Sequence, residues 1–296
     1  MTQRRFSRAD VRYTGRRFGA RLVRHLLLWL AIAFALFPVL WIFSASINPT
    51  NALSTQRFIP ESITWDHYRS LFTDPNYPFV TWLLNTLKIA GITAIGTVIL
   101  CALSGYSFSR FHFRGRRLGL LAMLLVQMFP QMLAMVAIFL LLRAIGDLVP
   151  AFGLNTHYGL IMVYLGGAMG FNTWLVKGYY DTVPRSLEES AMVDGATPFQ
   201  AFWRIMLPLV RPILAVILMI QFMTSYAEFI LARVLLQGTE MYTLSVGMRF
   251  FTEQAMERRW GPFAAGAIVG GVTFLFLFLP FQRLIVSGLT RGAVKE

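Results

Sequence analysis

The chain has 296 residues, of which 56% are hydrophobic and 14% are charged. Soluble domains carry about a quarter charged residues, so this composition excludes an ordinary soluble protein and predicts a membrane protein. The net charge of +13 could indicate a nucleic-acid partner, but the basic residues lie in short runs between apolar segments. Positive loops of a membrane protein explain that pattern better than a phosphate-binding face, so we expect no nucleic acid.

Residues 1–25 form a basic N-terminal tail with eight arginines and one acidic residue, Asp10. The apolar run that follows extends from Leu26 past Ile47. A cleaved signal peptide has an apolar region of only about 7 to 15 residues, so this run predicts an uncleaved first transmembrane helix.

Six stretches reach the length of about 20 apolar residues that a helix needs to cross a bilayer. They are roughly Leu26–Ile47, Val80–Ser104, Leu118–Leu142, His157–Val176, Pro212–Ala232 and Phe263–Ile285. The sequence therefore predicts an all-α polytopic membrane protein with a transmembrane domain over residues 26–287 and a short C-terminal tail, residues 288–296.

The distribution of lysine and arginine outside these stretches predicts the orientation. Eighteen lie on the side of the two termini and residues 184–208, and seven lie on the other side. By the positive-inside rule, both termini and residues 184–208 are cytoplasmic, whereas loops 48–79 and 233–262 are external.

Three predicted helices contain residues that weaken a helix: Pro38, Pro130 and the pair Gly166-Gly167. Proline kinks a helix, and a kinked helix suits a gate. The alternative is that proline and glycine are simply frequent in membrane helices.

Lys88, Glu228 and the single cysteine, Cys101, lie inside the predicted spans. Lys88 is close enough to the outer end of its helix to extend its ammonium group into water. Glu228 lies near the outer end of the fifth span, where it faces either a pore mouth or water. Cys101 lies in an apolar run, and one cysteine excludes an internal disulfide.

Both long outer loops are predicted to carry structure. In loop 48–79, Thr64 is placed to cap a short helix, and we expect this loop to cover the outer face as a lid. Loop 233–262 is rich in aromatic residues, which argues against disorder and indicates a functional loop.

Residues 184–208 predict two short helices joined at a glycine. Ser186 and Glu189 have the spacing of a capping box at the start of the first helix. Gly195 can adopt the left-handed conformation that ends a helix, and Thr197-Pro198 can start the second. The second helix would carry an apolar stripe made of Phe199, Phe202, Trp203 and Met206.

This segment resembles the EAA loop of ABC importer permeases, the cytoplasmic segment that docks into the ATPase subunit. The resemblance is carried by Glu189-Ser190-Ala191, Gly195 and Ile205-Met206-Leu207-Pro208, with Ser190 standing where the family usually has alanine. It implies that the ATPase is contacted by Glu189, Ser190, Ala191, Asp194, Gly195, Ile205, Leu207 and Pro208. The alternative is an amphipathic helix lying at the membrane interface.

Further segments resemble the smaller permease subunits of maltose and maltodextrin importers. They are Gly153–His157, Tyr164–Gly167, Lys177–Tyr179, Tyr242–Gly247, Trp260–Ala265 and Ser287–Lys295. The resemblance implies a type I ABC importer permease fold and a heterodimer with a larger permease subunit. It also implies two copies of an ATPase subunit and an extracytoplasmic sugar-binding protein as partners.

The same resemblance implies roles for two further groups of residues. Gly288, Leu289, Thr290 and Gly292 would contact the ATPases, and Thr252, Glu253, Gln254, Met256 and Trp260 would contact the binding protein. The basic N-terminal tail and residues 252–260 depart from the family pattern, which leaves the transported sugar open.

The sequence contains no Gly-x-x-x-x-Gly-Lys-Ser/Thr motif for nucleotide phosphates and no His/Cys cluster with metal-ligand spacing. We therefore expect a transport subunit that is not itself an enzyme and holds no cofactor or metal. The alternatives are a permease for another sugar, such as a trehalose-like disaccharide or glycerol phosphate, and an ion-coupled secondary transporter. A membrane enzyme is a third, but Glu228 lacks a second catalytic group beside it.

Overall fold

The computed structural model describes residues 8–51, 57–253 and 259–293, and every regular element in these ranges is helical. The elements are α1 (Arg8–Ile47), α2 (Asp66–Thr73), α3 (Phe79–Arg110), α4 (Arg116–Met128), α5 (Gln131–Leu148), η2 (Pro150–Phe152), α6 (His157–Thr182), α7 (Ser186–Val193), α8 (Pro198–Ala201), the π-helical η3 (Phe202–Met206), α9 (Leu207–Ala227), α10 (Ile230–Leu235), η4 (Thr239–Met241), α11 (Leu244–Met248), α12 (Phe250–Glu253) and α13 (Trp260–Ala293).

Five helical segments of the described chain are long and apolar enough to cross a membrane, and a bent pair makes a sixth if it is counted as one span. The prediction of about six transmembrane helices is confirmed. The predicted end of the fifth span at Ala232 is wrong, because α9 ends at Ala227 and a new helix, α10, begins at Ile230.

The bent pair consists of α4 and α5, which meet at an angle of 106°. The prediction of one continuous, kinked helix over Leu118–Leu142 is therefore wrong, because the chain there forms two separate helices. Pro130 has no N–H to continue the helix, and it forces Phe129 into an extended conformation with ψ of 129°. The other two weakening sites, Pro38 and Gly166-Gly167, end neither α1 nor α6.

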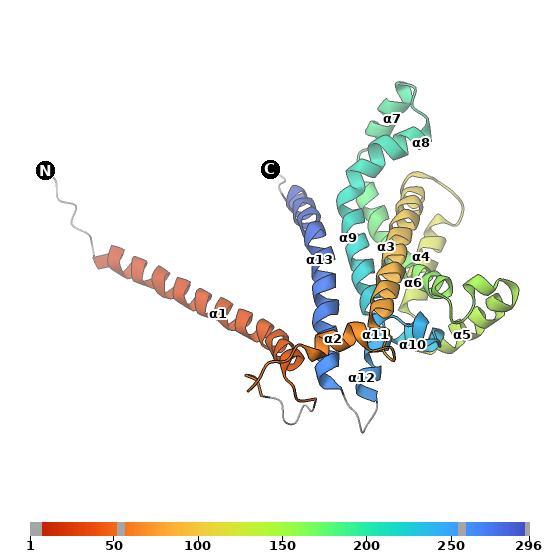
Figure 1. Ribbon diagram of the computed structural model, residues 1–296. Helices are drawn as coiled ribbons and strands as arrows, with labels where there is room; N and C mark the ends of the chain where they lie inside the picture. The colour runs from red at the N-terminus through yellow and green to blue at the C-terminus, as the bar shows by residue number, and fades with distance from the viewer. Residues whose placement is uncertain (1–7, 52–56, 254–258, 294–296) are drawn as a thin grey trace.

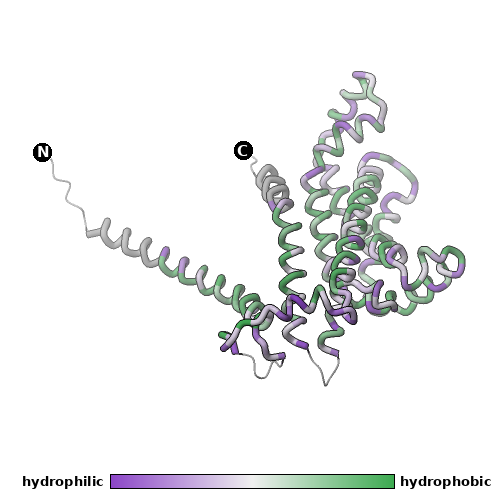
Figure 2. The backbone as a smooth tube through the Cα atoms, in the orientation of Figure 1, coloured by the Kyte–Doolittle hydropathy of each residue, from purple (hydrophilic) through white to green (hydrophobic). Residues whose placement is uncertain are grey.

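Helix α3 is the centre of the bundle, with α6 and α9 packed against it and α13 packed against α9 (Figure 1). The α3–α6 contact requires glycine at position 105, since a Cβ atom there would lie 2.8 Å from Cγ1 of Val176. Figure 2 shows apolar residues along α3, α9 and α13 and polar residues in α7 and α8.

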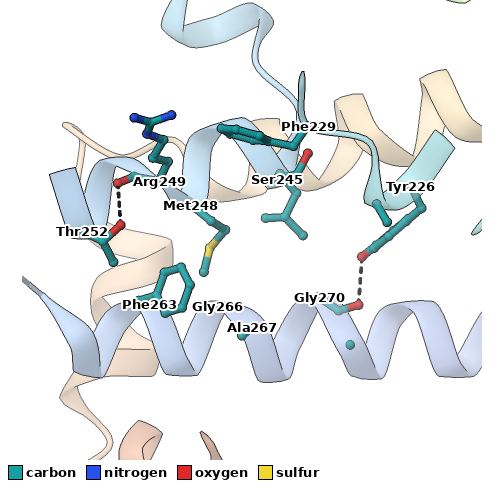
Figure 3. A pocket seen from close by; sticks show the side chains of 13 residues that line it. Tyr226, Phe229, Ser245, Met248, Arg249, Thr252, Phe263, Gly266, Ala267 and Gly270 are labelled. Atoms are coloured by element: carbon teal, nitrogen blue, oxygen red, sulfur yellow. Dashed lines mark hydrogen bonds between the residues drawn. The ribbon is translucent and has the colours of Figure 1, made fainter. Parts of the chain in front are cut away.

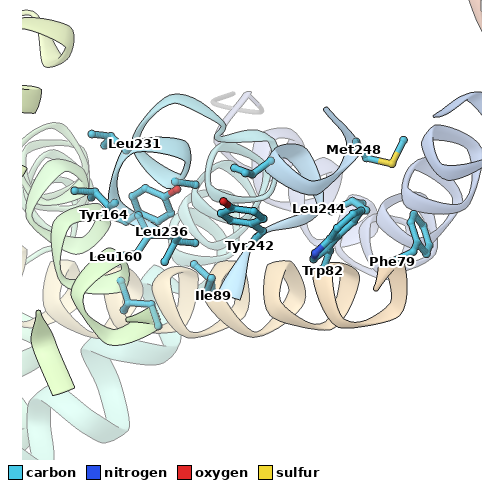
Figure 4. Close-up of a cluster of buried hydrophobic side chains, with 14 of the residues drawn as sticks. Phe79, Trp82, Ile89, Leu160, Tyr164, Leu231, Leu236, Tyr242, Leu244 and Met248 are labelled. Atoms are coloured by element: carbon cyan, nitrogen blue, oxygen red, sulfur yellow. The ribbon is translucent and has the colours of Figure 1, made fainter. Parts of the chain in front are cut away.

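Two clusters of buried side chains hold this bundle together. The larger cluster lies beside α10 and α11 and includes Phe79, Trp82, Tyr164 and Tyr242 (Figure 4). The smaller one lies near α7 and α8 and joins α3, α6 and α9 through Cys101, Tyr180, Met206, Ile217 and their neighbours. Both ends of the bundle therefore have a packed apolar interior.

Helix α1 extends away from the bundle (Figure 1). Its span, Arg21–Ile47, has no buried residue in its most apolar window, and buried side chains occur only towards its C-terminal end, at Ser44, Ala45 and Ser46. An apolar helix with this exposure suits contact with lipid or with another subunit.

Loop 48–79 contains the short helix α2, but the predicted cap by Thr64 is wrong, because the N-cap is Trp65 and makes no side-chain cap bond. Thr64 lies one residue before the N-cap, where its hydroxyl oxygen accepts a hydrogen bond from the backbone N–H of Asp66 at 3.2 Å. The loop is tied to loop 233–262 by Arg259, whose Nη1 lies 2.8 Å from Oδ2 of Asp74. Arg259 also lies over the ring of Tyr77, 5.1 Å from its centroid. This ion pair joins the two long loops.

The ion pair predicts a pH-dependent contribution to stability. The hydrogen bond from Arg259 holds the pKa of Asp74 below its ordinary value of 3.8. A lowered folded-state pKa stabilises the protein above the unfolded-state pKa, and this contribution is lost as the pH falls through the folded-state pKa. We expect Asp74→Asn to destabilise the protein by about 1 kcal/mol at pH 7. Wild type and variant should converge once the pH falls below the folded-state pKa of Asp74, which lies under 3.8.

Thermal unfolding of the two purified proteins across this pH range tests the expectation. Glu61→Gln is the matched control, because the Arg57–Glu61 pair is 72% and 75% exposed and should contribute little at any pH. An Asp74→Asn difference that is constant with pH would contradict the ion-pair explanation.

Candidate functional site

Residues 184–208 form a protrusion, here called the knob, at one end of the bundle (Figure 1). It contains α7, α8 and η3. Gly195 has φ of +87°, a left-handed conformation that ends α7. Ala196 N–H bonds to Ala191 C=O at 2.9 Å, and Gly195 N–H bonds to Met192 C=O at 3.1 Å. These two bonds make a Schellman motif, so the predicted glycine joint is confirmed.

The two predicted helix starts have different outcomes. Thr197 caps α8 as predicted, and it forms a capping box with Gln200. The capping box of Ser186 and Glu189 is wrong, because Ser186 is already the first residue of α7 and its predecessor, Arg185, has helical φ and ψ of −66° and −27°. Pro184 pre-sets the backbone for a helix, so the first turn begins earlier than the Ser186 spacing predicts.

The second helix of the knob does not end before the fifth span. It runs without a break from α8 through η3 into α9. Pro208 cannot donate to the C=O of Arg204, and the N–H of Leu207 bonds to the C=O of Phe202 in the π-helical pattern. The knob is thus continuous with a membrane-spanning helix, which can transmit a displacement of the knob into the bundle.

The predicted apolar stripe of the knob is only half buried. Phe202 and Met206 pack into the bundle, at 5% and 0% exposure, whereas Phe199 and Trp203 are 69% and 60% exposed. Val193 is 87% exposed on the same knob. Apolar side chains exposed on a polar protrusion indicate a surface for another protein.

The residues predicted to contact an ATPase lie at two levels of the knob. Glu189, Ser190, Asp194 and Gly195 are exposed and Ala191 is half-buried. Ile205, Leu207 and Pro208 are half-buried near the junction with the bundle. The first group can contact a partner directly, whereas the second group fixes how the knob is attached.

A buried ion pair that the sequence analysis missed anchors the knob. Arg110, the last residue of α3, places Nε 2.6 Å from Oε2 of Glu188 in α7, and their side chains are only 7% and 8% exposed. Nη2 of Arg110 also donates to the C=O of Val183 at 2.9 Å. A charged pair 78 positions apart in the sequence has no local signal that could have revealed it.

A second polar group lies beside this ion pair. Ser109 donates to Oδ1 of Asp181 at 2.7 Å, and Lys177 pairs with Oδ2 of the same carboxylate at 2.6 Å. The C=O of Ser109 accepts a bond of 3.3 Å from Arg185 of the knob. Helix α3 thus bonds both to α6 and to the segment that carries α7.

The other predicted contact residues lie apart from the knob. The backbone of Gly288, Leu289, Thr290 and Gly292 continues α13, so the predicted C-terminal tail is helical up to Ala293. Thr252 and Glu253 end α12, and Trp260 begins α13 at the opposite end of the bundle from the knob (Figure 1). Gln254 and Met256 lie outside the described residues.

Much of loop 233–262 folds into the bundle at that opposite end. Trp82, Asn85 and Thr86 of α3 bond to the backbone of residues 239–244, at 2.7 to 3.0 Å. His157 lies 2.9 Å from the C=O of Met241. Gly247 must be glycine, since a Cβ atom there would lie 2.1 Å from the ring of Trp82. The loop is therefore held rigidly up to its tip.

Glu228 has a structural role that neither alternative from the sequence anticipated. Its carboxylate accepts the backbone N–H groups of Leu231 and Ala232 at 2.8 and 3.0 Å, and therefore caps α10. The hydroxyl of Tyr164 donates to the same carboxylate. The other intramembrane charge, Lys88, is exposed.

A cavity of about 530 Å³ opens between the end of α9, α11, α12 and α13. Its walls include Phe229, Met248 and Phe263 (Figure 3). Gly266 and Gly270 form the α13 side, where the C=O of Gly270 accepts a bond of 2.8 Å from Tyr226. The cavity is mostly apolar and lies on the side of the bundle away from the knob.

Comparison with known proteins finds several relatives that carry the same name. The chain is 42% identical to the maltose/maltodextrin transport system permease protein MalG of Escherichia coli (strain K12), over 93% of this chain and 96% of that protein. It is 42% identical to the protein of the same name from Photorhabdus laumondii, over 93% and 95% of the two chains. A relative of that name from Vibrio parahaemolyticus is 41% identical over 92% and 94%.

Solved structures show a similar fold. A bacterial ABC transporter involved in the import of the acidic polysaccharide alginate contains a chain with a TM-score of 0.74 and 24% identity, over 95% of this chain and 99% of that one. Residues 98–291 match the family described as binding-protein-dependent transport system inner membrane component. This match, together with the full-length similarity to permeases, shows that the chain is a multi-pass inner-membrane permease subunit and belongs to that family.

Proposed function

We propose that this chain is the smaller permease subunit of an ATP-driven importer for maltose or maltodextrins. The observation that carries the proposal is the knob, a Schellman-jointed pair of helices continuous with α9 and presenting Glu189 beside exposed apolar residues. The sugar is inferred from the similarity to maltose/maltodextrin permeases over nearly the whole chain.

The proposed orientation places the knob in the cytoplasm, in accordance with the excess of basic residues on that side. There it would dock on one of two ATPase subunits, with Glu189 bonded to a basic residue of the ATPase cleft in a charge-assisted contact. ATP hydrolysis would then move α9 through the knob. Gly288, Leu289, Thr290 and Gly292 at the end of α13 would contact the ATPases from the same side.

The remaining proposed partners are a larger permease subunit and an extracytoplasmic sugar-binding protein. Exposed apolar residues of α1 offer surface to the permease partner. Thr252, Glu253 and Trp260 would face the binding protein, together with Gln254 and Met256 of the loop tip. The bonds from α3 to residues 239–240 would hold the described part of this loop in a fixed position on the bundle.

The cargo is tested by ATP hydrolysis of the assembled complex with its binding protein, measured with a panel of sugars. We expect maltose and maltotriose to stimulate hydrolysis and trehalose and glycerol phosphate to leave it at the basal rate. Stimulation by trehalose or glycerol phosphate alone would show that the importer carries that compound and not maltose. Uptake that persists without the ATPase subunit but stops with an uncoupler would replace the importer with an ion-coupled transporter.

A further inference from the structure

Positive charge is concentrated at the start of α4, in a place that the proposed import mechanism does not use. The chain reads Arg114-Gly115-Arg116-Arg117 there, and Gly115 turns it with φ of +84° into α4. Helix α4 has no side-chain cap, and although the N–H of Arg116 bonds to the C=O of Phe113 at 3.3 Å, the N–H groups of Arg117 and Leu118 have no capping partner among the described residues. Two arginines at the positive end of a helix dipole are unfavourable unless an anion is bound nearby.

Gly115, Arg116 and Arg117 line a cavity of about 670 Å³ between the α3–α4 loop, the first turns of α4, and α6. Phe113, Arg116, Arg117, Leu118 and Lys177 are among its lining residues. The cavity lies towards the end of the bundle that carries the knob (Figure 1). It therefore opens near one membrane surface, where lipid headgroups lie.

The charges that face this cavity leave a positive excess. Asp181 neutralises Lys177 through the 2.6 Å ion pair. Arg116 makes only a long bond of 3.4 Å to the C=O of Ser109, and Arg117 has no hydrogen bond or ion pair within the part of the chain that the structure describes. Two guanidinium groups are thus available, and their planar donors match the oxygens of a phosphate.

An exposed apolar strip begins at the same cavity. Leu118, Leu121 and Leu125 lie on one face of α4, at 70%, 50% and 56% exposure. The strip leads along α4 away from the two arginines. A free phosphate ion would make no contact with such a strip, whereas the acyl chain of a lipid would.

We propose that this cavity binds the phosphate headgroup of an anionic phospholipid, with an acyl chain along Leu118, Leu121 and Leu125. Basic pockets between transmembrane helices are suited to such headgroups. The site holds the start of α4 against α6, next to the ion pairs that anchor the knob. It does not depend on which sugar is carried.

The test uses the full-length chain purified with its copurifying subunits from membranes of phosphatidylcholine and phosphatidylglycerol, and native mass spectrometry of the retained lipids. We expect preferential retention of phosphatidylglycerol, and Arg117→Gln should lower it about five-fold, the effect of one basic side chain near an anionic surface. Arg114→Gln is the matched control, because it removes the same charge three positions earlier in the chain, and Arg114 does not line the cavity.

Three results would overturn the proposal: no preference for phosphatidylglycerol in the wild-type protein, equal losses in the two variants, or displacement of the lipid by millimolar inorganic phosphate. Because Arg117→Gln could also impair assembly, the wild-type protein is tested separately with a photoactivatable phosphatidylglycerol that carries its reactive group on the acyl chain. Crosslinks should fall on α4 at Leu118 or Leu121, and crosslinks confined to other helices would refute the site.

Discussion

Replacing Gly195 with valine is expected to lower sugar uptake by about ten-fold and to prevent sugar from stimulating ATP hydrolysis. Gly195 has φ of +87°, where a left-handed conformation costs an L-residue about 1–2 kcal/mol. A β-branched residue is especially disfavoured there. Apart from its two chain neighbours, no atom of the described residues lies within 4 Å of a Cβ built at this position, so the effect comes from the backbone and not from a clash. Uptake and ATPase assays of the assembled complex measure both quantities.

Gly195→Asn is the matched control for this experiment. Asparagine tolerates the left-handed conformation, so uptake should stay within about two-fold of wild type. If valine and asparagine have equal effects, the conformation of the glycine joint is not what the importer requires. If valine leaves uptake unchanged, the knob is not the coupling element.

Breaking the buried pair of Arg110 and Glu188 is expected to have the largest effect on stability. Removing one partner leaves an uncompensated charge in an almost fully buried position, which costs about 3–5 kcal/mol. Oε1 of Glu188 and the hydroxyl of Tyr180 are buried without any hydrogen-bond partner among the described residues, so neither offers Glu188 a replacement for Arg110. We expect Arg110→Met to unfold at a lower temperature and to accumulate poorly in the membrane.

The double variant Arg110→Met/Glu188→Met tests whether the lost stability comes from leaving one buried charge without its partner. Replacing both charges by apolar groups of similar size is often neutral, so the double variant should regain most of the lost stability. Asp181→Asn is the control, because its pair with Lys177 is 24% and 41% exposed and should contribute about 1 kcal/mol or less. A double variant less stable than Arg110→Met alone would refute the explanation.

Local features of the knob could be predicted from the sequence because short-range chemistry determines them. The left-handed glycine and the Thr197-Pro198 start each depend on a few neighbouring residues, and both are confirmed. The capping role of Ser186 failed for a local reason as well, since Pro184 moved the helix start. Apolar length alone was sufficient to predict the number of spans.

Features that depend on distant parts of the chain, or on other chains, could not be predicted. Nothing near Arg110 in the sequence indicates Glu188, and nothing near Trp82 indicates that it bonds to Thr239. The apolar stripe predicted in the knob did not indicate which of its residues are buried, and the structure shows Phe202 and Met206 buried but Phe199 and Trp203 exposed. An apolar residue can be buried in the core of its own chain or against another subunit, and periodicity does not distinguish the two cases.

The most direct test of the importer mechanism is the accessibility of the knob to an impermeant thiol reagent. Cys101 is buried, so cysteines placed at the exposed positions Val193 of the knob and Ile59 of loop 48–79 can be followed separately. In right-side-out membrane vesicles, Ile59→Cys should react and Val193→Cys should not. In inside-out vesicles, Val193→Cys should react only after the ATPase subunit is removed. Reaction of Val193→Cys in right-side-out vesicles would show that the knob cannot dock on a cytoplasmic ATPase.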